Sequence, residues 1–301
     1  MTAPQSLSRA DGTPRFAGRG LVGACVRIAG EIDPRLGVLL ERLRWRRRGE
    51  GQSLRIIEAL VRPGSVVLDI GANRGDYTWQ LARLVGPMGH VHAIEPDPAS
   101  VARLEALREE CPNVTVHAIA ASDQTGTATL YVPVFDGRRI GALARLSLTR
   151  EWTAVDFEAV TIRVEPLDAI LAPDGPPIAF VKLDVEGHEA AVIRGAQAML
   201  RRSLPPLLVE IEQRHQKEEI GATFAQLREL GYVGYAVRAS GLTSLDDFDV
   251  QRDQLAFVTG DFVAGWMPPG YVHDFLFVRP EADVQTLMAP VRSPARRQPA
   301  G

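Results

Sequence analysis

The residues best suited to chemistry in this sequence follow an apolar run that ends at residue 70. In the stretch VVLDIGANRGDYT, β-branched residues give way to a turn that holds Gly71, Asn73 and Gly75, with Asp69 just before it. Glycine in such a turn permits close backbone approach and backbone angles that other residues adopt only at a cost in free energy. The turn is therefore predicted to contact a ligand.

A second apolar run, HVHAIE, ends in Glu95. An acid that follows a glycine turn by about twenty residues binds the ribose hydroxyls in dinucleotide-binding folds. The glycine pattern departs from the G-x-G-x-x-G of those folds, however, and Asp69 and Asp76 flank the turn. Because a pyrophosphate is disfavoured beside carboxylates, the acids favour a cationic adenosine cofactor, which is S-adenosylmethionine.

The elements that must position these residues alternate along the chain. Short β-rich runs are separated in most cases by segments of helical periodicity, and this alternation predicts a mostly parallel sheet with helices on both faces, a doubly wound α/β fold. Ligands bind such folds at the carboxyl ends of the strands. The predicted strands lie at residues 66–70, 91–95, 114–120, 178–184, 206–212, 232–237, 255–260 and 273–280. The predicted helices lie at residues 78–86, 99–110, 190–200 and 224–231.

Three regions are expected. Residues 1–50 form a partly helical N-terminal extension, residues 51–280 the main domain, and residues 281–301 a disordered tail rich in Pro, Arg and Ala. Within the domain, residues 128–168 interrupt the alternation and are typical of an inserted hairpin or lid.

Composition narrows the function classes. The chain has 301 residues, 46% of them hydrophobic, and a net charge of −3, so no overall basic field is available for nucleic acid or an anionic membrane. The two cysteines have no disulfide or zinc spacing, and no apolar run is long enough to span a membrane. We therefore expect a cytoplasmic protein with no nucleic-acid partner.

Several motifs together resemble the FkbM-type S-adenosylmethionine-dependent methyltransferases. They are VVLDIGANRGDYT, HAIEPDPASVARLE, VTVHAIAASDQTGTATLYV, VEPLDAIL, VKLDVEGHEAAVIRGA and LLVEIE, and they occur in order over roughly residues 54–280. The resemblance implies a class I methyltransferase, Rossmann-like sheet of seven strands. It also implies a methyl acceptor with a hydroxyl on a sugar, glycolipid or secondary metabolite.

The resemblance also implies roles for individual residues. Cofactor contacts would come from Asp69, Gly71, Asn73, Gly75 and Glu95, with Ser122 and Asp123 beside the adenine. The family's K-x-D-x-E-G-x-E motif matches Lys182, Asp184, Glu186 and Glu189, at the end of the strand expected to neighbour the first. The acceptor would enter there.

The chemistry on the acceptor side has two possible forms. Methyl transfer needs chiefly alignment, but an attacking hydroxyl gains from a base. His188 is the first candidate base, since it follows Asp184 and Glu186 and precedes the predicted helix at residues 190–200. His215 is the second candidate. Alternatively, carboxylates at the strand ends could hold a magnesium ion against the hydroxyl. Those carboxylates are Asp184, Glu186, Glu210 and Glu212.

Two other function classes share the predicted fold. A nicotinamide-dependent oxidoreductase would carry the G-x-G-x-x-G turn and a catalytic pair such as Tyr-x-x-x-Lys, and neither is found at a suitable place. A non-catalytic nucleotide-binding protein would keep the sheet and lose the acids of the loop, whereas Asp69 and Glu95 are both present.

Overall fold

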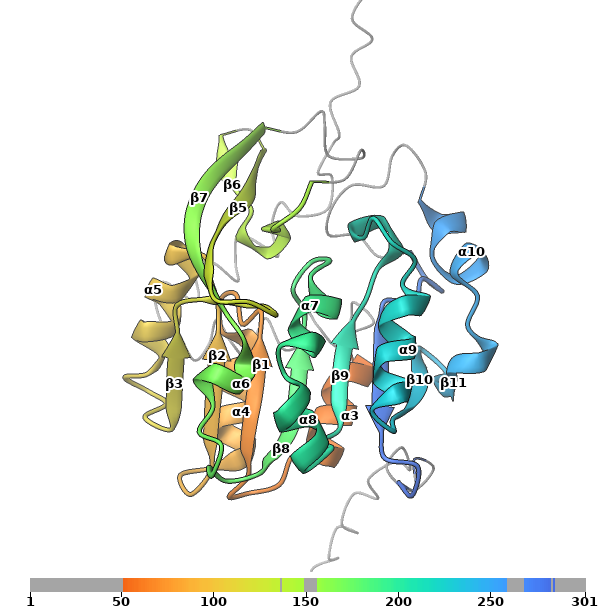
Figure 1. The fold of residues 1–301 in the computed structure, drawn as a ribbon, viewed down its shortest axis with the longest axis horizontal. Coiled ribbons are helices and arrows are strands. Elements are labelled where there is room, and N and C mark those ends of the chain that lie inside the picture. The colour runs from red at the N-terminus through yellow and green to blue at the C-terminus, as the bar shows by residue number, and fades with distance from the viewer. Residues whose placement is uncertain (1–50, 136, 149–155, 259–267, 283, 285–301) are drawn as a thin grey trace, which may run out of the picture.

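A computed structural model of the chain describes residues 51–135, 137–148, 156–258, 268–282 and 284 (Figure 1). The predicted N-terminal extension lies outside the described residues, as do residues 285–301 of the predicted tail.

The main sheet has eight strands among the described residues, in the order β11-β10-β12-β9-β8-β1-β2-β3. The strands β3, β2, β1, β8 and β9 pair in parallel, whereas β12 runs antiparallel to both β9 and β10. The mostly parallel α/β sheet is confirmed. Its strands are β1 (Val66–Ile70), β2 (His90–Ile94), β3 (Val114–His117), β8 (Ile178–Leu183), β9 (Leu207–Glu210), β10 (Val233–Arg238), β11 (Gly241–Ser244) and β12 (Asp274–Val278).

Two strand predictions need correction. The run at 255–260 does not begin a strand, because Leu255–Phe257 form a 3-10 turn, η5. The preceding Gln254 is buried, and its side-chain amide donates to the carbonyls of Ile211 and Val272, each at 2.8 Å, which fixes this turn beside the ends of β9 and β12. The eighth strand, β11, was not predicted, since its GLTS sequence has little apolar character and it forms only by pairing with β10.

Helices cover both faces of the sheet. One face packs against α7 (Glu189–Arg194), α8 (Gln197–Ser203) and α9 (Gly221–Glu229), and the other against α3 (Gly51–Leu60), α4 (Asp76–Val85) and α5 (Pro98–Leu107). Each face of the sheet forms a hydrophobic core with the helices that cover it, and alternate residues of a strand point into one core or the other. Leu68 and Ile70 therefore pack with α7 to α9, and Val67 with α3 and α4. Other short helices in the described part of the chain include α6 (Leu167–Ile170), α10 (Val250–Asp253), η3 (Gln213–His215) and η4 (Leu245–Asp247).

The helix predicted at 190–200 is divided into α7 and α8 at Gly195. A Cβ atom at Gly195 would lie 1.8 Å from the carbonyl oxygen of Ser122, so the close approach of these two backbones requires glycine there. At the break, the loop after β4 (Ala120–Ala121) packs against the end of α7. This contact positions part of the site described below.

The inserted segment is a long hairpin, as predicted. Strand β5 (Gly126–Phe135) pairs antiparallel with β7 (Asp156–Glu165), and with β4 and β6 (Arg138–Arg139) they form a second, four-stranded sheet. The hairpin stands above the edge at which the parallel strands end (Figure 1). A 3-10 turn, η1 (Gly141–Leu143), lies between β6 and β7, and Arg139 bonds the buried Asp97 at 3.0 Å. The insertion is thereby attached to the start of α5.

Candidate active site

The loop after β1 is held in left-handed backbone conformations. The φ angles of Gly71, Asn73 and Gly75 are 79°, 48° and 89°. The backbone nitrogen of Gly71 donates to the carbonyl of Ile94 at 2.9 Å, so the loop is tied to the end of β2. A Cβ atom at Gly71 would lie 1.7 Å from the carbonyl oxygen of Asp184. Glycine is therefore required both by the turn and by the neighbouring strand end.

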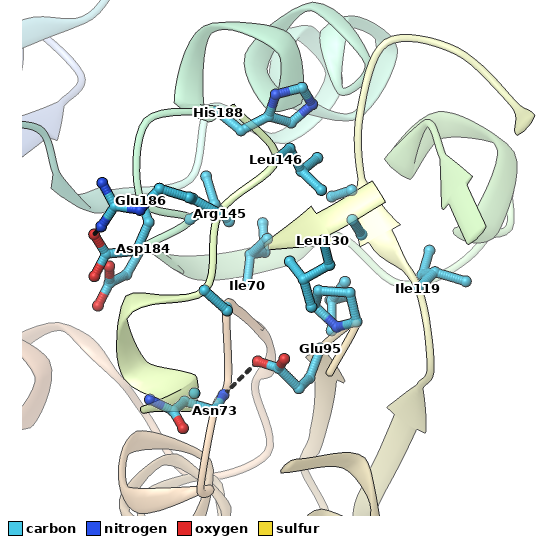
Figure 2. A pocket seen from close by; sticks show the side chains of 18 of the residues that line it. Ile70, Asn73, Glu95, Ile119, Leu130, Arg145, Leu146, Asp184, Glu186 and His188 are labelled. Atoms are coloured by element: carbon cyan, nitrogen blue, oxygen red, sulfur yellow. Dashed lines mark hydrogen bonds and ion pairs between the residues drawn. The ribbon is translucent and has the colours of Figure 1, made fainter. Parts of the chain in front are cut away.

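Glu95 receives backbone hydrogen bonds from two directions. Its carboxylate accepts from the nitrogen of Asn73 at 2.7 Å (Figure 2). It also accepts from the nitrogen of Asp97 at 2.8 Å. Burial of Glu95, which is 6% exposed, raises its pKa to about 7. The acid thus joins the glycine loop to the end of β2, and each carboxylate oxygen keeps a further lone pair for a ligand.

Asp69 is buried at the end of β1, and its hydrogen bond supports the glycine loop. Its carboxylate accepts from the hydroxyl of Thr78 at 2.6 Å, and its pKa is raised to about 6 by burial. This bond joins the end of β1 to the first turns of α4.

A cavity of about 580 Å³, including its opening, lies at the carboxyl ends of β1, β2 and β8 (Figure 2). One part is apolar, and its wall includes Ile94, Ile119 and Leu130. The opposite part is polar, with Asp184 and Glu186 on its wall. The connection from β6 to β7, within the insertion, contributes Gly141, Ala142, Ala144, Arg145 and Leu146. The cavity therefore lies between the sheet edge and the insertion.

Of the predicted site residues, six line this cavity: Gly71, Asn73, Glu95, Asp184, Glu186 and His188. The other four, Asp69, Gly75, Ser122 and Asp123, do not belong to its lining.

His188 is bonded to the loop that precedes the insertion. Its Nε2 lies 3.0 Å from the Ser122 hydroxyl oxygen, and that hydroxyl donates to Asp123 at 3.4 Å. Asp123 accepts in turn from Arg194 at 2.8 Å, an interaction that lowers the pKa of Asp123. Burial lowers the pKa of His188. The imidazole is consequently neutral near pH 7 and held by a chain of polar contacts.

Asp184 belongs to a second buried group of charges. The ammonium of Lys182 lies 3.3 Å from Asp184 and 4.0 Å from Glu210, and it also lies over the Tyr77 ring at 5.1 Å. Burial raises the pKa of Asp184 and raises that of Glu210 well above its usual range. The Lys182 ammonium is therefore shared by two carboxyl groups whose charged forms are disfavoured by burial.

Glu186 makes contacts separate from those of His188. Its carboxylate lies 3.3 Å from Arg145 and 2.9 Å from Nδ1 of His215. Burial opposes ionisation, but His215 and Arg145 outweigh it and lower the pKa of Glu186. The three predicted catalytic residues therefore line one cavity through different partners and do not form a single bonded triad.

Glu212 is already paired by side chains of its own neighbourhood. It binds Arg214 through two contacts, at 2.6 and 2.9 Å, and accepts from the Tyr271 hydroxyl. The four carboxylates considered for magnesium thus have different partners, and Glu186 and Glu212 are both held by cations.

Two contributors to this region were missed by the sequence interpretation. Arg145 comes from the insertion, and its side chain is fully buried. It belongs to no motif in the sequence that would have indicated a place in the site. His273 lies next to β12 and faces Glu210, and a lone histidine before an apolar run has no pattern that could have identified it.

The lining fits an adenosyl cofactor. A buried carboxylate with free lone pairs suits two ribose hydroxyls, and the adjacent apolar wall suits a flat base. The side-chain oxygen of Asn73 is buried and has no hydrogen-bond partner among the described residues, so it offers a further polar contact at the loop. The strand-end carboxylates would face a cationic centre.

A glycine loop after the first strand, an acid after the second, and a cavity at the carboxyl edge of a parallel sheet define a Rossmann-like cofactor-binding protein. Residues 69–235 match the model of the methyltransferase FkbM domain, which is more than half of the chain. The chain belongs to the FkbM methyltransferase family, and its sheet is of the class I methyltransferase type.

Solved structures with a similar fold include FkbM methyltransferase from Methylobacillus flagellatus KT, at 16% identity and a TM-score of 0.43, with 84% of this chain and 58% of that chain covered. Fibrillarin from Aeropyrum pernix with bound S-adenosyl-L-methionine has 14% identity and a TM-score of 0.41, with 73% of this chain and 68% of that chain covered. An S-adenosylmethionine-dependent O-methyltransferase from Thermotoga maritima has 13% identity and a TM-score of 0.38, with 76% of this chain and 64% of that chain covered.

The chain spans 58% of the Methylobacillus protein. No curated protein matches the sequence. Within the described part of the chain, no helix is both long enough and apolar enough to cross a membrane.

Proposed function

We propose that this protein transfers a methyl group from S-adenosylmethionine to a hydroxyl of a sugar, glycolipid or secondary metabolite. The observation that carries the proposal is the position of Glu95, at the end of β2, beside the glycine loop and on the wall of the cavity. Family membership agrees with this assignment of cofactor.

The residues that would hold the cofactor are those of the cavity wall. Glu95 would accept from the ribose hydroxyls, Ile94, Ile119 and Leu130 would enclose the adenine, and Asp184 would face the cationic end. When bound, the cofactor supplies a methyl group made electrophilic by a positively charged sulfur. The chain then has to align the acceptor oxygen and exclude water.

His188 is the residue we assign as general base. The Ser122 hydroxyl donates to Asp123, so its oxygen is available to accept the Nε2 proton of His188. That tautomer leaves the lone pair on Nδ1, which can take a proton from an acceptor hydroxyl. In this assignment Ser122 and Asp123 are positioning residues, and they act through the imidazole.

The charge of the cavity supports a small or glycan acceptor. Asp184 and Glu186 line its polar part, and a phosphodiester backbone is disfavoured beside such carboxylates. The net charge of −3 points the same way.

The test is a transfer assay with S-adenosylmethionine labelled in the methyl group. The full chain is incubated with fractionated extract of the producing organism, and the labelled product is identified by mass spectrometry. We expect the label on an oxygen of a small molecule or glycan. Label on nitrogen, on carbon or on nucleic acid would contradict the proposed acceptor. A lack of S-adenosylhomocysteine binding, measured in parallel with NAD as the control ligand, would contradict the proposed cofactor.

A further inference from the structure

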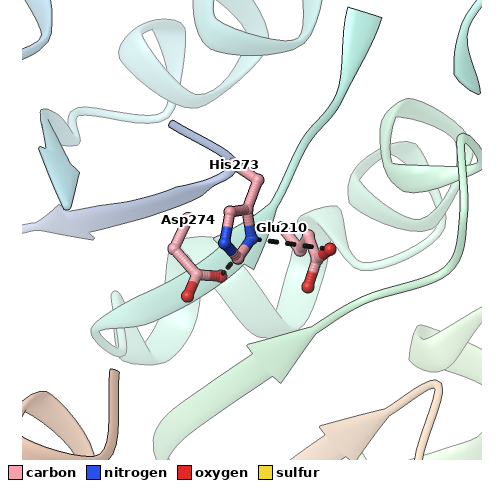
Figure 3. Close-up of side chains that lie close together, drawn as sticks. All are labelled: Glu210, His273 and Asp274. Carbon is pink, nitrogen blue, oxygen red and sulfur yellow. Dashed lines mark ion pairs between the residues drawn. The ribbon is translucent and has the colours of Figure 1, made fainter. Parts of the chain in front are cut away.

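A group of donor atoms outside the cavity is formed where β9 ends and β12 begins. Glu210 is the last residue of β9, Asp274 is the first of β12, and the two are paired in the antiparallel register. His273 precedes Asp274, and one donor atom from each of the three residues lies within 4.8 Å of the others (Figure 3). The group thus contains two carboxylates and one imidazole.

The facing atoms of the group make only long contacts with each other. Nδ1 of His273 lies 3.5 Å from Glu210 Oε1 and 3.8 Å from Asp274 Oδ1, beyond a normal hydrogen bond. Both His273 Nδ1 and Asp274 Oδ1 are buried and have no hydrogen-bond partner within the described structure, and Asp274 is 5% exposed. Unpaired buried polar atoms are unfavourable, so this arrangement indicates a ligand between them.

The other atoms of the group are already held. The second oxygen of Asp274 accepts from the hydroxyl of Ser53, on α3, and the backbone nitrogen of Ile211 donates to the His273 carbonyl at 2.8 Å. The second oxygen of Glu210 lies 4.0 Å from the Lys182 ammonium. These contacts orient the three donors toward one point, as outer contacts do in metal sites.

We propose that Glu210, His273 and Asp274 bind a first-row divalent metal ion. Bonds of about 2.0–2.2 Å to such an ion place neighbouring donor atoms roughly 3 to 3.6 Å apart, so the separations of 3.5 and 3.8 Å need only small side-chain shifts. An imidazole with two carboxylates favours manganese, iron or zinc, whereas magnesium prefers an all-oxygen set.

The nearby lysine does not cancel the charge of this group. Lys182 faces Asp184 as well as Glu210, so one ammonium stands against the carboxylates of Asp184, Glu210 and Asp274. Binding a divalent ion would displace the proton that burial and Asp184 favour on Glu210 and the proton that Asp274 and Glu210 favour on His273.

None of the three proposed ligands lines the cavity, so the metal site does not depend on the proposed methyl transfer. Asp184 stands between the two sites, since it lines the cavity and shares Lys182 with Glu210. Two of the three ligands and Ser53 also lie outside the segment that matches the family model.

The test uses the full chain, stripped with chelator and then titrated with Mn²⁺ while free Mn²⁺ is followed by electron paramagnetic resonance. We expect one ion per chain, displaced by Zn²⁺ and at least tenfold more weakly by Mg²⁺. Glu210→Gln, His273→Gln and Asp274→Asn should each weaken binding by about tenfold or more, and Ser53→Ala, which keeps every ligand, by a smaller factor. Circular dichroism checks that each variant is folded.

Two matched substitutions serve as controls. Glu219→Gln removes an exposed carboxylate, and His90→Gln removes a histidine of β2, which lies beside His92 with ring centroids 4.8 Å apart. Binding should be unchanged in both. The proposal is overturned if the stripped protein binds neither Mn²⁺ nor Zn²⁺ in stoichiometric amount, if binding survives in both Glu210→Gln and Asp274→Asn, or if His90→Gln abolishes it. Binding of S-adenosylhomocysteine is measured on the same samples, so a failure of the metal site is distinguished from a failure of the cofactor site.

Discussion

At the scale of single residues, the assignment of His188 depends on which ring nitrogen carries the proton. The contacts of Ser122 with Asp123 and with His188 favour a proton on Nε2, because the hydroxyl proton is directed to the carboxylate. Burial lowers the pKa of the imidazole, so it remains available as a base below the usual titration range of histidine.

His188→Gln should lower turnover by about two to four orders of magnitude while leaving the affinity for S-adenosylhomocysteine unchanged, because only the proton acceptor is lost. Steady-state kinetics and calorimetry on the same preparation measure both quantities. Full activity of this variant would remove the base from the mechanism and leave alignment as the source of catalysis.

Ser122→Ala should reduce kcat by a smaller factor, about tenfold, and displace the acidic limb of the pH–rate profile, since the imidazole loses the contact that fixes its tautomer. The buried Ser203, on α8 and away from the cavity lining, is the matched control, and Ser203→Ala should leave the profile in place. A uniform fall in kcat without displacement of the limb would argue against a positioning role for Ser122.

At the scale of elements, the site depends on the junction of β1 with β8. From the sequence alone, Gly71 could be explained by contact with a ligand. The structure adds a backbone reason, since the loop after β1 passes against the carbonyl of Asp184 at the end of β8. The contact between Gly71 and the Asp184 carbonyl therefore positions the glycine loop relative to the carboxylates of Asp184 and Glu186.

Gly71→Ala should destabilise the fold by about 2 to 4 kcal/mol, the sum of an unfavourable positive φ and a clash with backbone that cannot rotate away. Denaturant unfolding measures it. Gly64 is a matched control, because its φ is +82° against +79° at Gly71 and a Cβ atom there has nothing within 4 Å. The free energy of unfolding of Gly64→Ala should fall by only about 1 kcal/mol, which is the cost of the positive φ alone. Equal losses in the two variants would show that the contact with Asp184 carries no strain.

The elements near the cofactor loop were predictable because their signals are local. A β-branched run that ends in glycine marks β1, and an apolar run that ends in Glu95 marks β2. The partners of His188 were not predictable, since Ser122 is 66 positions away in sequence and its backbone packs closely against Gly195, between α7 and α8. Arg145 belongs to the insertion, whose path over the cavity has no periodic signal.

At the scale of the whole molecule, buried carboxyl groups link folding to pH. Burial raises the pKa values of Glu95 and Glu189 to about 7. A group whose pKa is higher in the folded state contributes stability that is fully present below its unfolded pKa and is lost as the pH rises through its folded pKa. These acids therefore favour folding more at pH 5.5 than at pH 8.

Glu189→Gln isolates one of these groups. The side chain is 1% exposed and accepts from the Gly187 nitrogen and the Gln216 amide, each at 2.9 Å. The unfolding free energy of the parent minus that of the variant should fall by about 2 kcal/mol between pH 5.5 and pH 8. Chemical denaturation at both values measures the difference. A constant difference would mean that Glu189 does not titrate in this range.

We assign the cavity at the carboxyl edge of the sheet to an adenosyl cofactor held by Glu95. Isothermal titration calorimetry with S-adenosylhomocysteine, on the parent and on Glu95→Ala, tests this assignment. The exposed acid of α5 gives a matched control, Glu105→Ala. We predict one bound molecule per chain in the parent and the control, no binding of NAD, and a loss of about 1 to 3 kcal/mol in Glu95→Ala, because buried ribose hydroxyls lose their acceptor. Equal affinity of the parent and Glu95→Ala for S-adenosylhomocysteine would show that Glu95 does not hold the cofactor.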